Sequence, residues 1–305
     1  MKHAVSISLG SPTRDKKVFV TFKGETICIE RIGTGGDAEK ARKLFTELDG
    51  KVDALSVGGL DLYVRLDGRD YPVHSARILV KDVHQTPLVD GRIFKYVLER
   101  RVFELAEPVL GKLPHFKRAF MPFTVDRIGL AQAVSSVADE VYFGDLMFML
   151  KIPIAIRGLK RFKQIAKAIM PIAGFLPLET LYPPGVKDEA PHPKHRKHWE
   201  AADLIAGDMH YIRKYSSENL QRKWVITNTT TEENVDFLKK RGVSIIITTT
   251  PRYEGRSFGI NMMEAALTAY AGKGRPLSPE ELNDLVDELD LRPEVIRLAE
   301  TTYLL

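Results

Sequence analysis

Residues 118–145 constrain the fold of this chain most, because their pattern changes from strand to helix and back within one short segment. The segment contains an apolar run, a polar turn, a helix of small residues and a second apolar run, at residues 119–123, 124–127, 129–138 and 141–143. This order fits within the roughly 30 residues that a βαβ crossover needs. It predicts two parallel strands joined by a helix.

The start of the predicted helix is suited to a nucleotide. Gly129, Ala131 and Ala133 keep the helix slim, so it can lie close to the sheet and a pyrophosphate can approach its positive end. Asp145 ends the second strand about 20 residues after the turn, where nucleotide-binding units place the acid that holds a ribose. We predict cofactor contacts at Thr124, Gly129 and Asp145. The G-x-G-x-x-G fingerprint is absent, so a βαβ unit without a ligand is the alternative.

Three later apolar runs end in small polar residues and predict further strands, at residues 202–208, 223–231 and 243–251. Between the last two, residues 232–240 predict a helix capped by Thr231. Continuous apolar strands separated by helices favour a parallel sheet covered on both faces, with polar strand ends along one edge. We therefore predict an α/β fold with two α/β domains, the second a Rossmann-like, doubly wound and mainly parallel sheet.

The rest of the chain predicts a first α/β domain and a short C-terminal addition. Strand and hairpin patterns occur at residues 3–9, 17–31 and 52–59. An amphipathic helix at 94–105 runs into Pro108, near which we place the domain boundary. The predicted parts are a substrate-side α/β domain, a Rossmann-like nucleotide-binding domain and a C-terminal helical extension, at residues 1–112, 113–272 and 273–305.

Composition favours a soluble protein that binds a small molecule. The 305 residues are 44% hydrophobic and 28% charged, and no apolar run approaches the roughly 18 residues of a membrane span. The N-terminus has no signal-peptide pattern and Cys28 is the single cysteine, so we expect a cytoplasmic protein. The net charge of +5 is spread among 40 acidic residues, which favours an anionic small molecule over nucleic acid. A homo-oligomer is compatible with these features, but the sequence defines no oligomeric state.

Polar residues at the predicted strand ends are candidates for ligand contacts. Asn228, Thr229 and Thr249 supply small polar groups at the ends of successive strands, and we predict that they touch the cofactor. Threonine is also favoured in strands for its shape alone, so each one taken singly has a structural explanation. Two such clusters on neighbouring strands favour the binding role.

A second group of residues is suited to an anionic substrate. Gly58 and Asp61 follow a buried-type strand, at the carboxyl end where ligands approach α/β sheets. Arg252, Arg256 and Ser257 follow a later strand, and guanidinium groups suit a carboxylate or phosphate. Exposed arginines can equally serve solubility. We predict these five residues as substrate contacts.

A dehydrogenase also needs a base, because the substrate hydroxyl loses its proton when hydride leaves. Asp126, His210, Lys81 and His84 are available, and we predict Asp126 or His210 as the catalytic residue. Either one can instead cap a helix or bond locally.

A metal site is not predicted. Three histidines recur at a spacing of three, at His192, His195 and His198. Pro193 prevents one continuous helix, and no carboxylate or cysteine stands at ligand spacing. We therefore predict a basic loop without a bound metal.

Several stretches together resemble a bacterial family labelled quinate 5-dehydrogenase, over about residues 1–272. They are SISLGS, DALSVGGLDLY, TPLVDG, VDRIGLAQA, GDLMF, AGDMHYIRKY, ITNTTTEENVDFLKKRGV and TTTPRYEGRSFGINMMEA. The resemblance implies NAD-dependent oxidation of quinate to 3-dehydroquinate, with separate substrate and cofactor domains similar to those of shikimate dehydrogenases. The Asn-Thr-Asp-x-x-Gly motif of those enzymes is matched only at Asp126 and Gly129, since Thr124 and Val125 stand at its first two positions. Their Asn-Val-Thr-x-Pro-x-Lys motif has no counterpart here.

Two hypotheses follow from the sequence. The first is an NAD-dependent oxidoreductase acting on a hydroxylated carboxylic acid, with Asp145 on the adenosine ribose and Arg252 and Arg256 on the carboxylate. The second is a non-redox protein that binds a nucleotide or a sugar-acid anion at the same edge. The missing lysine motif and glycine fingerprint favour the second hypothesis.

Overall fold

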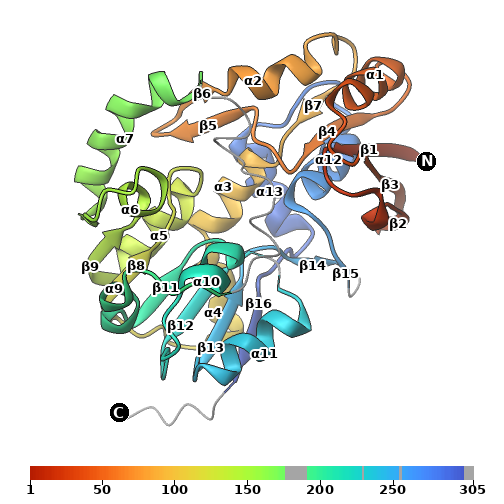
Figure 1. The fold of residues 1–305 in the computed structure, drawn as a ribbon. Coiled ribbons are helices and arrows are strands. Elements are labelled where there is room, and N and C mark those ends of the chain that lie inside the picture. Colours follow the sequence, from red (N-terminus) through yellow and green to blue (C-terminus); the bar gives the residue numbers. More distant parts are fainter. Residues whose placement is uncertain (176–190, 229, 254–255, 299–305) are drawn as a thin grey trace. The chain divides into compact units, whose positions relative to one another are not determined.

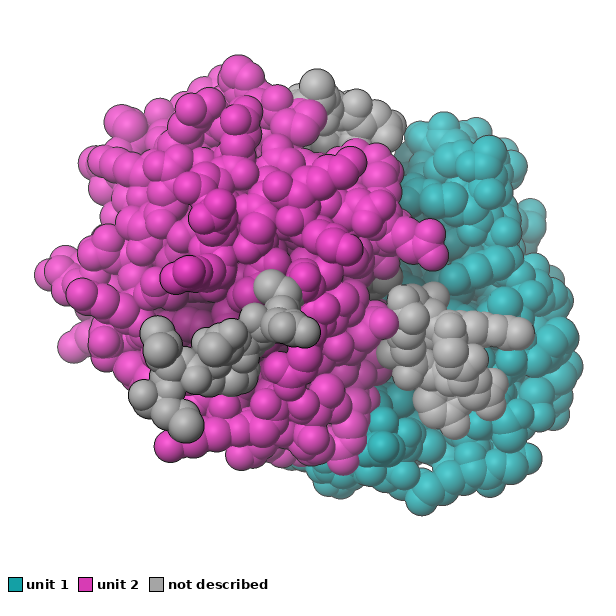
Figure 2. All heavy atoms as spheres, turned by 90° about the horizontal axis from the view of Figure 1, so that it is seen from below, with its two compact units in different colours: residues 1–97, 169–183, 253–291 teal, residues 98–168, 184–252, 292–305 magenta. Residues whose placement is uncertain are grey.

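The chain forms two compact α/β units in a computed structural model, which describes residues 1–175, 191–228, 230–253 and 256–298. Figure 2 distinguishes the two units by colour. Each is assembled from separate segments of the chain, namely residues 1–97, 169–183 and 253–291 for unit 1 and residues 98–168, 184–252 and 292–305 for unit 2. The sequence prediction of consecutive domains at 1–112, 113–272 and 273–305 differs from this division.

Unit 1 is built on a five-stranded sheet in the order β2-β3-β1-β4-β7. Its strands are β1 (Lys2–Ser8), β2 (Lys16–Phe22), β3 (Glu25–Gly33), β4 (Ala54–Gly58) and β7 (Leu88–Val89). β1 runs parallel to β3 and β4, β4 runs parallel to β7, and only β2 is antiparallel to its neighbour. A separate antiparallel pair of strands, β5 (Tyr63–Leu66) and β6 (Arg69–Pro72), turns at Asp67 and Gly68.

The helical segments of unit 1 cover this sheet and its loops. They are η1 (Pro12–Arg14), α1 (Ala38–Leu48), α2 (His74–Arg77), η2 (Ile78–Val80), α12 (Ile260–Ala271) and α13 (Pro279–Glu288). The side chain of Asp37 accepts a hydrogen bond from the Lys40 amide and so caps α1.

α12 packs on β1, β3 and β4, as Figure 1 shows. Its Asn261 donates hydrogen bonds to the hydroxyls of Ser6 and Ser56, on β1 and β4. Met263, Ala266 and Leu267 lie on the buried face of this helix. The sequence places this helix in the second domain, whereas its contacts place it in unit 1, because an apolar stripe shows which face is buried but not which sheet it covers.

Unit 2 is built on a seven-stranded sheet in the order β10-β9-β8-β11-β12-β13-β16. Its strands are β8 (Phe116–Met121), β9 (Ala138–Phe143), β10 (Ile156–Arg157), β11 (Leu204–Ala206), β12 (Trp224–Thr227), β13 (Ile245–Thr248) and β16 (Glu294–Arg297). The five central strands are parallel, and the two edge strands are antiparallel to them. The predicted fold class, two α/β domains of which the second is a Rossmann-like, mainly parallel sheet, is confirmed.

The helices of unit 2 alternate with these strands in sequence. They are α4 (Val102–Leu110), α5 (Ile128–Val137), α6 (Asp145–Met149), α9 (Arg196–Ala201), α10 (Met209–Tyr215) and α11 (Glu232–Lys240). α5 joins parallel β8 and β9, which confirms the crossover predicted at 118–145. Three further elements include residues of both units, namely α3 (Arg92–Arg100), α7 (Leu159–Ala173) and the short strand β14 (Arg252–Tyr253).

The C-terminal extension, which the sequence predicts as helical, is only partly helical in its described residues. α13 is a helix with a complete capping box between Ser278 and Glu281, but the segment that follows it forms β16. β16 pairs antiparallel with β13. The segment becomes a strand because an open sheet edge is available to pair with it, and the local sequence does not show that this edge is there. None of the described helices is long and apolar enough to cross a membrane.

Candidate functional site

The strand order of unit 2 defines one preferred place for a ligand. From β8 the chain moves to β9 on one side, and later returns to β11 on the other side of β8. In open α/β sheets, ligands bind at the carboxyl ends of the strands where the order reverses in this way. The loops that follow β8 and β11 therefore form the candidate site, and the loop after β12 lies next to them.

Arg127 is the central cation of this site. It is 5% exposed, and its guanidinium pairs with Glu99 and with Asp208, whose Oδ2 lies 3.2 Å from Nη2. Glu99 is 1% exposed. The backbone places Arg127 at the N-cap of α5, where its amide donates to the Thr124 carbonyl and its own carbonyl accepts from Ala131. Two carboxylates thus hold this cation in a fixed position.

Asp208 connects three elements at the reversal point. Its Oδ1 accepts from the His210 amide and caps α10, while its Oδ2 accepts from Arg127 and from the side-chain amide of Asn228 at 2.8 Å. The side-chain Oδ1 of Asn228 in turn accepts a hydrogen bond from the Met209 amide at 3.2 Å. The end of β12 is therefore tied to the start of α10. We define the Arg127 network as Glu99, Arg127, Asp208 and Asn228.

Asp145 stabilises the turn after β8. Its Oδ1 accepts from the amides of Thr124 and Val125, each at 2.9 Å. Burial raises the pKa of Asp145 to about 7, although these amides favour the charged form. Because the side chain is 7% exposed and Oδ1 is occupied, its observed contacts are internal, and its contact with a ribose stays a prediction.

Aromatic residues border the network. The rings of Phe123 and Tyr211 stack with centroids 5.0 Å apart and planes 6° from parallel. Burial, and next the charge of Asp126, raise the pKa of the Tyr211 phenol above its ordinary value. Tyr211, Asp126 and Asp208 therefore share one neighbourhood, which offers a stacking surface beside groups that bond to hydroxyls.

The structure brings several predicted residues together and separates others. Thr124, Asp126, Asp145 and Asn228 meet around the reversal point, and Gly129 is buried in the first turn of α5. His210 is exposed, and only its backbone amide takes part in the network. The other two predicted cofactor residues are Thr249, buried at the end of β13 with its amide bonded to the Thr227 carbonyl, and Thr229, which lies outside the described residues.

The sequence did not point to Glu99, Arg127, Asp208 or Tyr211. Arg127 and Asp208 do end the segments that follow strands β8 and β11, which is a usable signal. Glu99 carries no such signal, since it lies within helix α3 far from the turn in sequence.

The predicted substrate residues of the other segments have local roles in the described structure. Gly58 packs closely on β1, since a Cβ there would lie 2.7 Å from the Cβ of Ser8. Asp61 pairs with Lys95 at 3.6 Å. The other three are Arg252, Arg256 and Ser257, in β14 and β15 (Arg256–Ser257), and the structure describes only their backbone. Their contact with a substrate stays a prediction.

Histidine, cysteine and acidic side chains do not gather into a metal site anywhere in the described part of the chain. His195 is the N-cap of the short helix α9 in unit 2 and His198 lies within that helix, and burial lowers the pKa of both imidazoles. His198 stacks on Phe120 with centroids 5.5 Å apart, so it packs as part of the aromatic core.

Comparison with known families places most of the chain in one of them. Residues 93–298 match the family described as a domain of unknown function, DUF8754. The chain belongs to the DUF8754 family. Residues 3–90 match a second domain of unknown function, DUF8753. The match of the DUF8754 family covers the whole sheet of unit 2 and the helix α12 of unit 1.

Solved structures and curated proteins add little to this assignment. No curated protein matches the chain. A hetero-hexameric glutamate dehydrogenase from Thermus thermophilus is 11% identical, with a TM-score of 0.44 and coverage of 95% of this chain and 74% of that one. The glucose-galactose binding protein GanP from Geobacillus stearothermophilus is 12% identical, with a TM-score of 0.34 and 99% of both chains covered. These TM-scores are below 0.5, so neither likeness bears on function.

Proposed function

We propose that this protein is an NAD-dependent oxidoreductase that acts on a hydroxylated carboxylic acid, such as quinate, which it oxidises to 3-dehydroquinate. The observation that carries the proposal is the position of the Arg127 network at the reversal point of a doubly wound sheet, the place where such sheets bind nucleotides. The resemblance of the sequence to quinate 5-dehydrogenases supports the choice of reaction.

The residues at this site fit part of an NAD molecule. Side-chain atoms of Asp208 are 23% exposed and Asn228 is half-buried, so ribose hydroxyls can reach a carboxylate and an amide. The ten-residue helix α5 directs its positive end toward the same loops. NAD, when bound, supplies the hydride acceptor. Asp126 then takes the proton that the substrate hydroxyl loses, so that a ketone and one proton leave with the reduced cofactor.

A second candidate function is a non-redox protein that binds a nucleotide or an anion. It is favoured by the internal bonding of Asp145, whose Oδ1 is occupied by two backbone amides. A carboxylate whose Oδ1 already accepts two hydrogen bonds has less capacity to accept hydrogen bonds from ribose hydroxyls. The corresponding acid of a nucleotide-binding fingerprint binds the ribose directly.

Enzyme assays separate the two candidates. Purified protein is incubated with NAD or NADP and a panel of hydroxy acids including quinate and shikimate, and formation of the reduced cofactor is followed by absorbance. We expect turnover with NAD, and Asp126→Asn should lower kcat at least about 100-fold. Asp236→Asn, at an exposed position of α11, is the matched control and should leave kcat unchanged.

Two results would contradict the oxidoreductase. One is the absence of turnover with every acid, combined with measurable binding of NAD or of an acid in a thermal-shift titration, where ligand at 100 times Kd adds about 2.7 kcal/mol. That result supports the second candidate. The other is full activity of Asp126→Asn, which removes Asp126 from the mechanism.

A further inference from the structure

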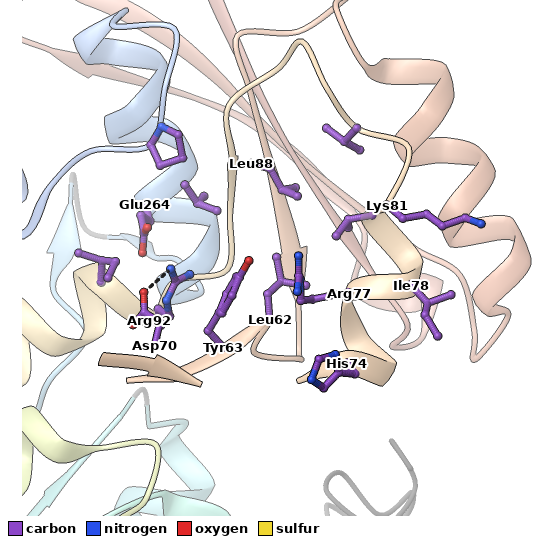
Figure 3. Close-up of a pocket in the computed structure, with 15 residues that line it drawn as sticks. Leu62, Tyr63, Asp70, His74, Arg77, Ile78, Lys81, Leu88, Arg92 and Glu264 are labelled. Carbon is purple, nitrogen blue, oxygen red and sulfur yellow. Dashed lines mark hydrogen bonds and ion pairs between the residues drawn. The ribbon is translucent and has the colours of Figure 1, made fainter. Parts of the chain in front are cut away.

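Unit 1 contains an open pocket of about 750 Å³ that none of the predicted site residues lines. Its walls come from β5, β6, α2, η2, β7, the start of α3 and α12 (Figure 3). Apolar side chains form much of the surface, including Leu62, Ile78, Val80 and Leu88. A volume of this size suits a small organic molecule, and the apolar walls suit one with a carbon skeleton.

Tyr63 stands between two arginines in this pocket. The guanidinium of Arg92 lies 4.6 Å from the ring centroid of Tyr63, and that of Arg77 lies 5.3 Å from it. Figure 3 shows the ring between Arg92 and Arg77. Arg92 is held by Asp70 and Asp90, at 3.1 and 2.9 Å. The ring and Arg92 therefore form a rigid wall.

Two basic residues that line the pocket are exposed, and one of them, Lys81, has the carboxylate of Asp82 near it. Arg77 and Lys81 are exposed, and neither forms an ion pair with another residue in the described part of the chain. Cations at the mouth of a pocket attract an anion, and a guanidinium can bind a carboxylate through two parallel hydrogen bonds.

Glu264 lines the same pocket without adding a negative charge at neutral pH. It is 2% exposed, and its Oε2 accepts a hydrogen bond from the Phe94 amide. Burial, and next the charge of Asp90, raise the pKa of Glu264 to about 8. The group is then a neutral carboxylic acid, which can donate a hydrogen bond to an oxygen of a ligand.

We propose that this pocket binds a small carboxylate that carries an alicyclic or aromatic ring. Arg77 and Lys81 bind the carboxylate, and the ring lies against Tyr63 and the apolar wall. Glu264 donates to a ring hydroxyl where the ligand has one. Inorganic phosphate lacks the carbon skeleton that the apolar wall requires, so it binds more weakly. This proposal rests on the proposed function in one respect, because quinate is chosen as a probe from it. Binding of a carboxylate in this pocket needs neither NAD nor turnover.

Calorimetric titration of the full chain at pH 7 tests the proposal. The probes are quinate, benzoate, cyclohexanecarboxylate and inorganic phosphate, without NAD. At least one ring carboxylate should bind, and phosphate should bind at least about tenfold more weakly. Arg77→Gln and Lys81→Gln should each raise Kd about tenfold, which corresponds to one lost charge-assisted contact.

Control variants separate a local effect from a general effect of charge. Arg14→Gln and Lys43→Gln remove exposed cations of unit 1 on η1 and α1, away from the residues that line the pocket. Both should keep the wild-type Kd. The proposal is overturned if no ring carboxylate binds, or if one binds with a Kd that Arg77→Gln and Lys81→Gln leave unchanged.

These experiments distinguish a refutation of the pocket proposal from a refutation of the oxidoreductase proposal. If a ring carboxylate binds and the two pocket variants weaken it, while no hydroxy acid is oxidised, the pocket stands and the enzyme proposal fails. If quinate is oxidised but no ring carboxylate binds without NAD, or one binds with a Kd that Arg77→Gln and Lys81→Gln leave unchanged, the enzyme proposal stands and the pocket is wrong.

Discussion

The Arg127 network of unit 2 and the pocket of unit 1 use charged residues in opposite ways. In the network, Arg127 is buried between Glu99 and Asp208, so its charge is neutralised inside the protein. In the pocket, Arg77 remains exposed beside Tyr63 with no acid partner in the described structure. Buried ion pairs hold a structure together, whereas an uncompensated cation at a pocket mouth is available to a ligand.

We expect the largest loss of stability when Arg127 is replaced. Arg127→Ala removes the cation between the buried carboxylate of Glu99 and the half-buried carboxylate of Asp208, and this should lower the free energy of unfolding by about 3 to 5 kcal/mol. Denaturant titration at pH 7 measures it. Arg161→Ala, at an exposed arginine of α7 in the same unit, is the control and should change stability by less than about 0.5 kcal/mol. A loss below 1 kcal/mol at Arg127 would contradict its role as the structural cation.

A pH-dependent effect is expected at Glu264. Its pKa is about 8 in the folded protein and about 4.5 in the unfolded chain, so the folded state binds more protons between these values. Stability should therefore decrease as pH rises from 4.5 to 8 and level off above. Glu264→Gln cannot ionise, and it should be more stable than the wild type at pH 9 by about 5 kcal/mol, because the rise from 4.5 to about 8 corresponds to about 1.4 kcal/mol for each pKa unit.

Unfolding of both proteins at pH 5 and pH 9 checks this. The difference in stability between Glu264→Gln and the wild type should be clearly larger at pH 9 than at pH 5. Equal differences at the two pH values would show that Glu264 has an ordinary pKa. Asp145 also has a raised pKa, of about 7, but it remains in both proteins and its effect cancels in the comparison.

A smaller effect is expected at Asn228. Asn228→Ala removes the bond to Asp208 and the bond from the Met209 amide, and it should cost about 1 to 2 kcal/mol of unfolding free energy. Gln164→Ala, on the exposed side of α7 in unit 2, should be close to neutral. If Asn228→Ala is also neutral, the link between β12 and α10 is unimportant for stability.

The smallest effect on stability is expected at Arg77. Arg77→Gln removes an exposed guanidinium with no ion pair in the described structure, so the free energy of unfolding should change by less than about 0.5 kcal/mol. Denaturant titration of this variant beside Arg127→Ala gives the contrast directly. A loss above 1 kcal/mol would mean that Arg77 is structural, and the difference between the two regions would disappear.

Local sequence determined the elements of the fold and their character. The change from strand to helix and back at residues 118–145 predicted the β8-α5-β9 crossover, and the polar strand ends predicted the edge that carries Thr124 and Asn228. Such patterns report burial of one face and chain direction, which depend on residues close together in sequence.

Tertiary structure alone decided how segments that are distant in sequence combine. α12 covers the sheet of unit 1, β16 joins the sheet of unit 2, and Glu99 reaches Arg127 from 28 positions away. The pocket likewise combines Glu264 with Tyr63 and Arg77. The side-chain pattern of a segment shows that one of its faces must be buried against another element, but many elements fit the same pattern. Only the packing of the whole chain selects one, because burial is non-directional and strand edges accept any chain of suitable direction.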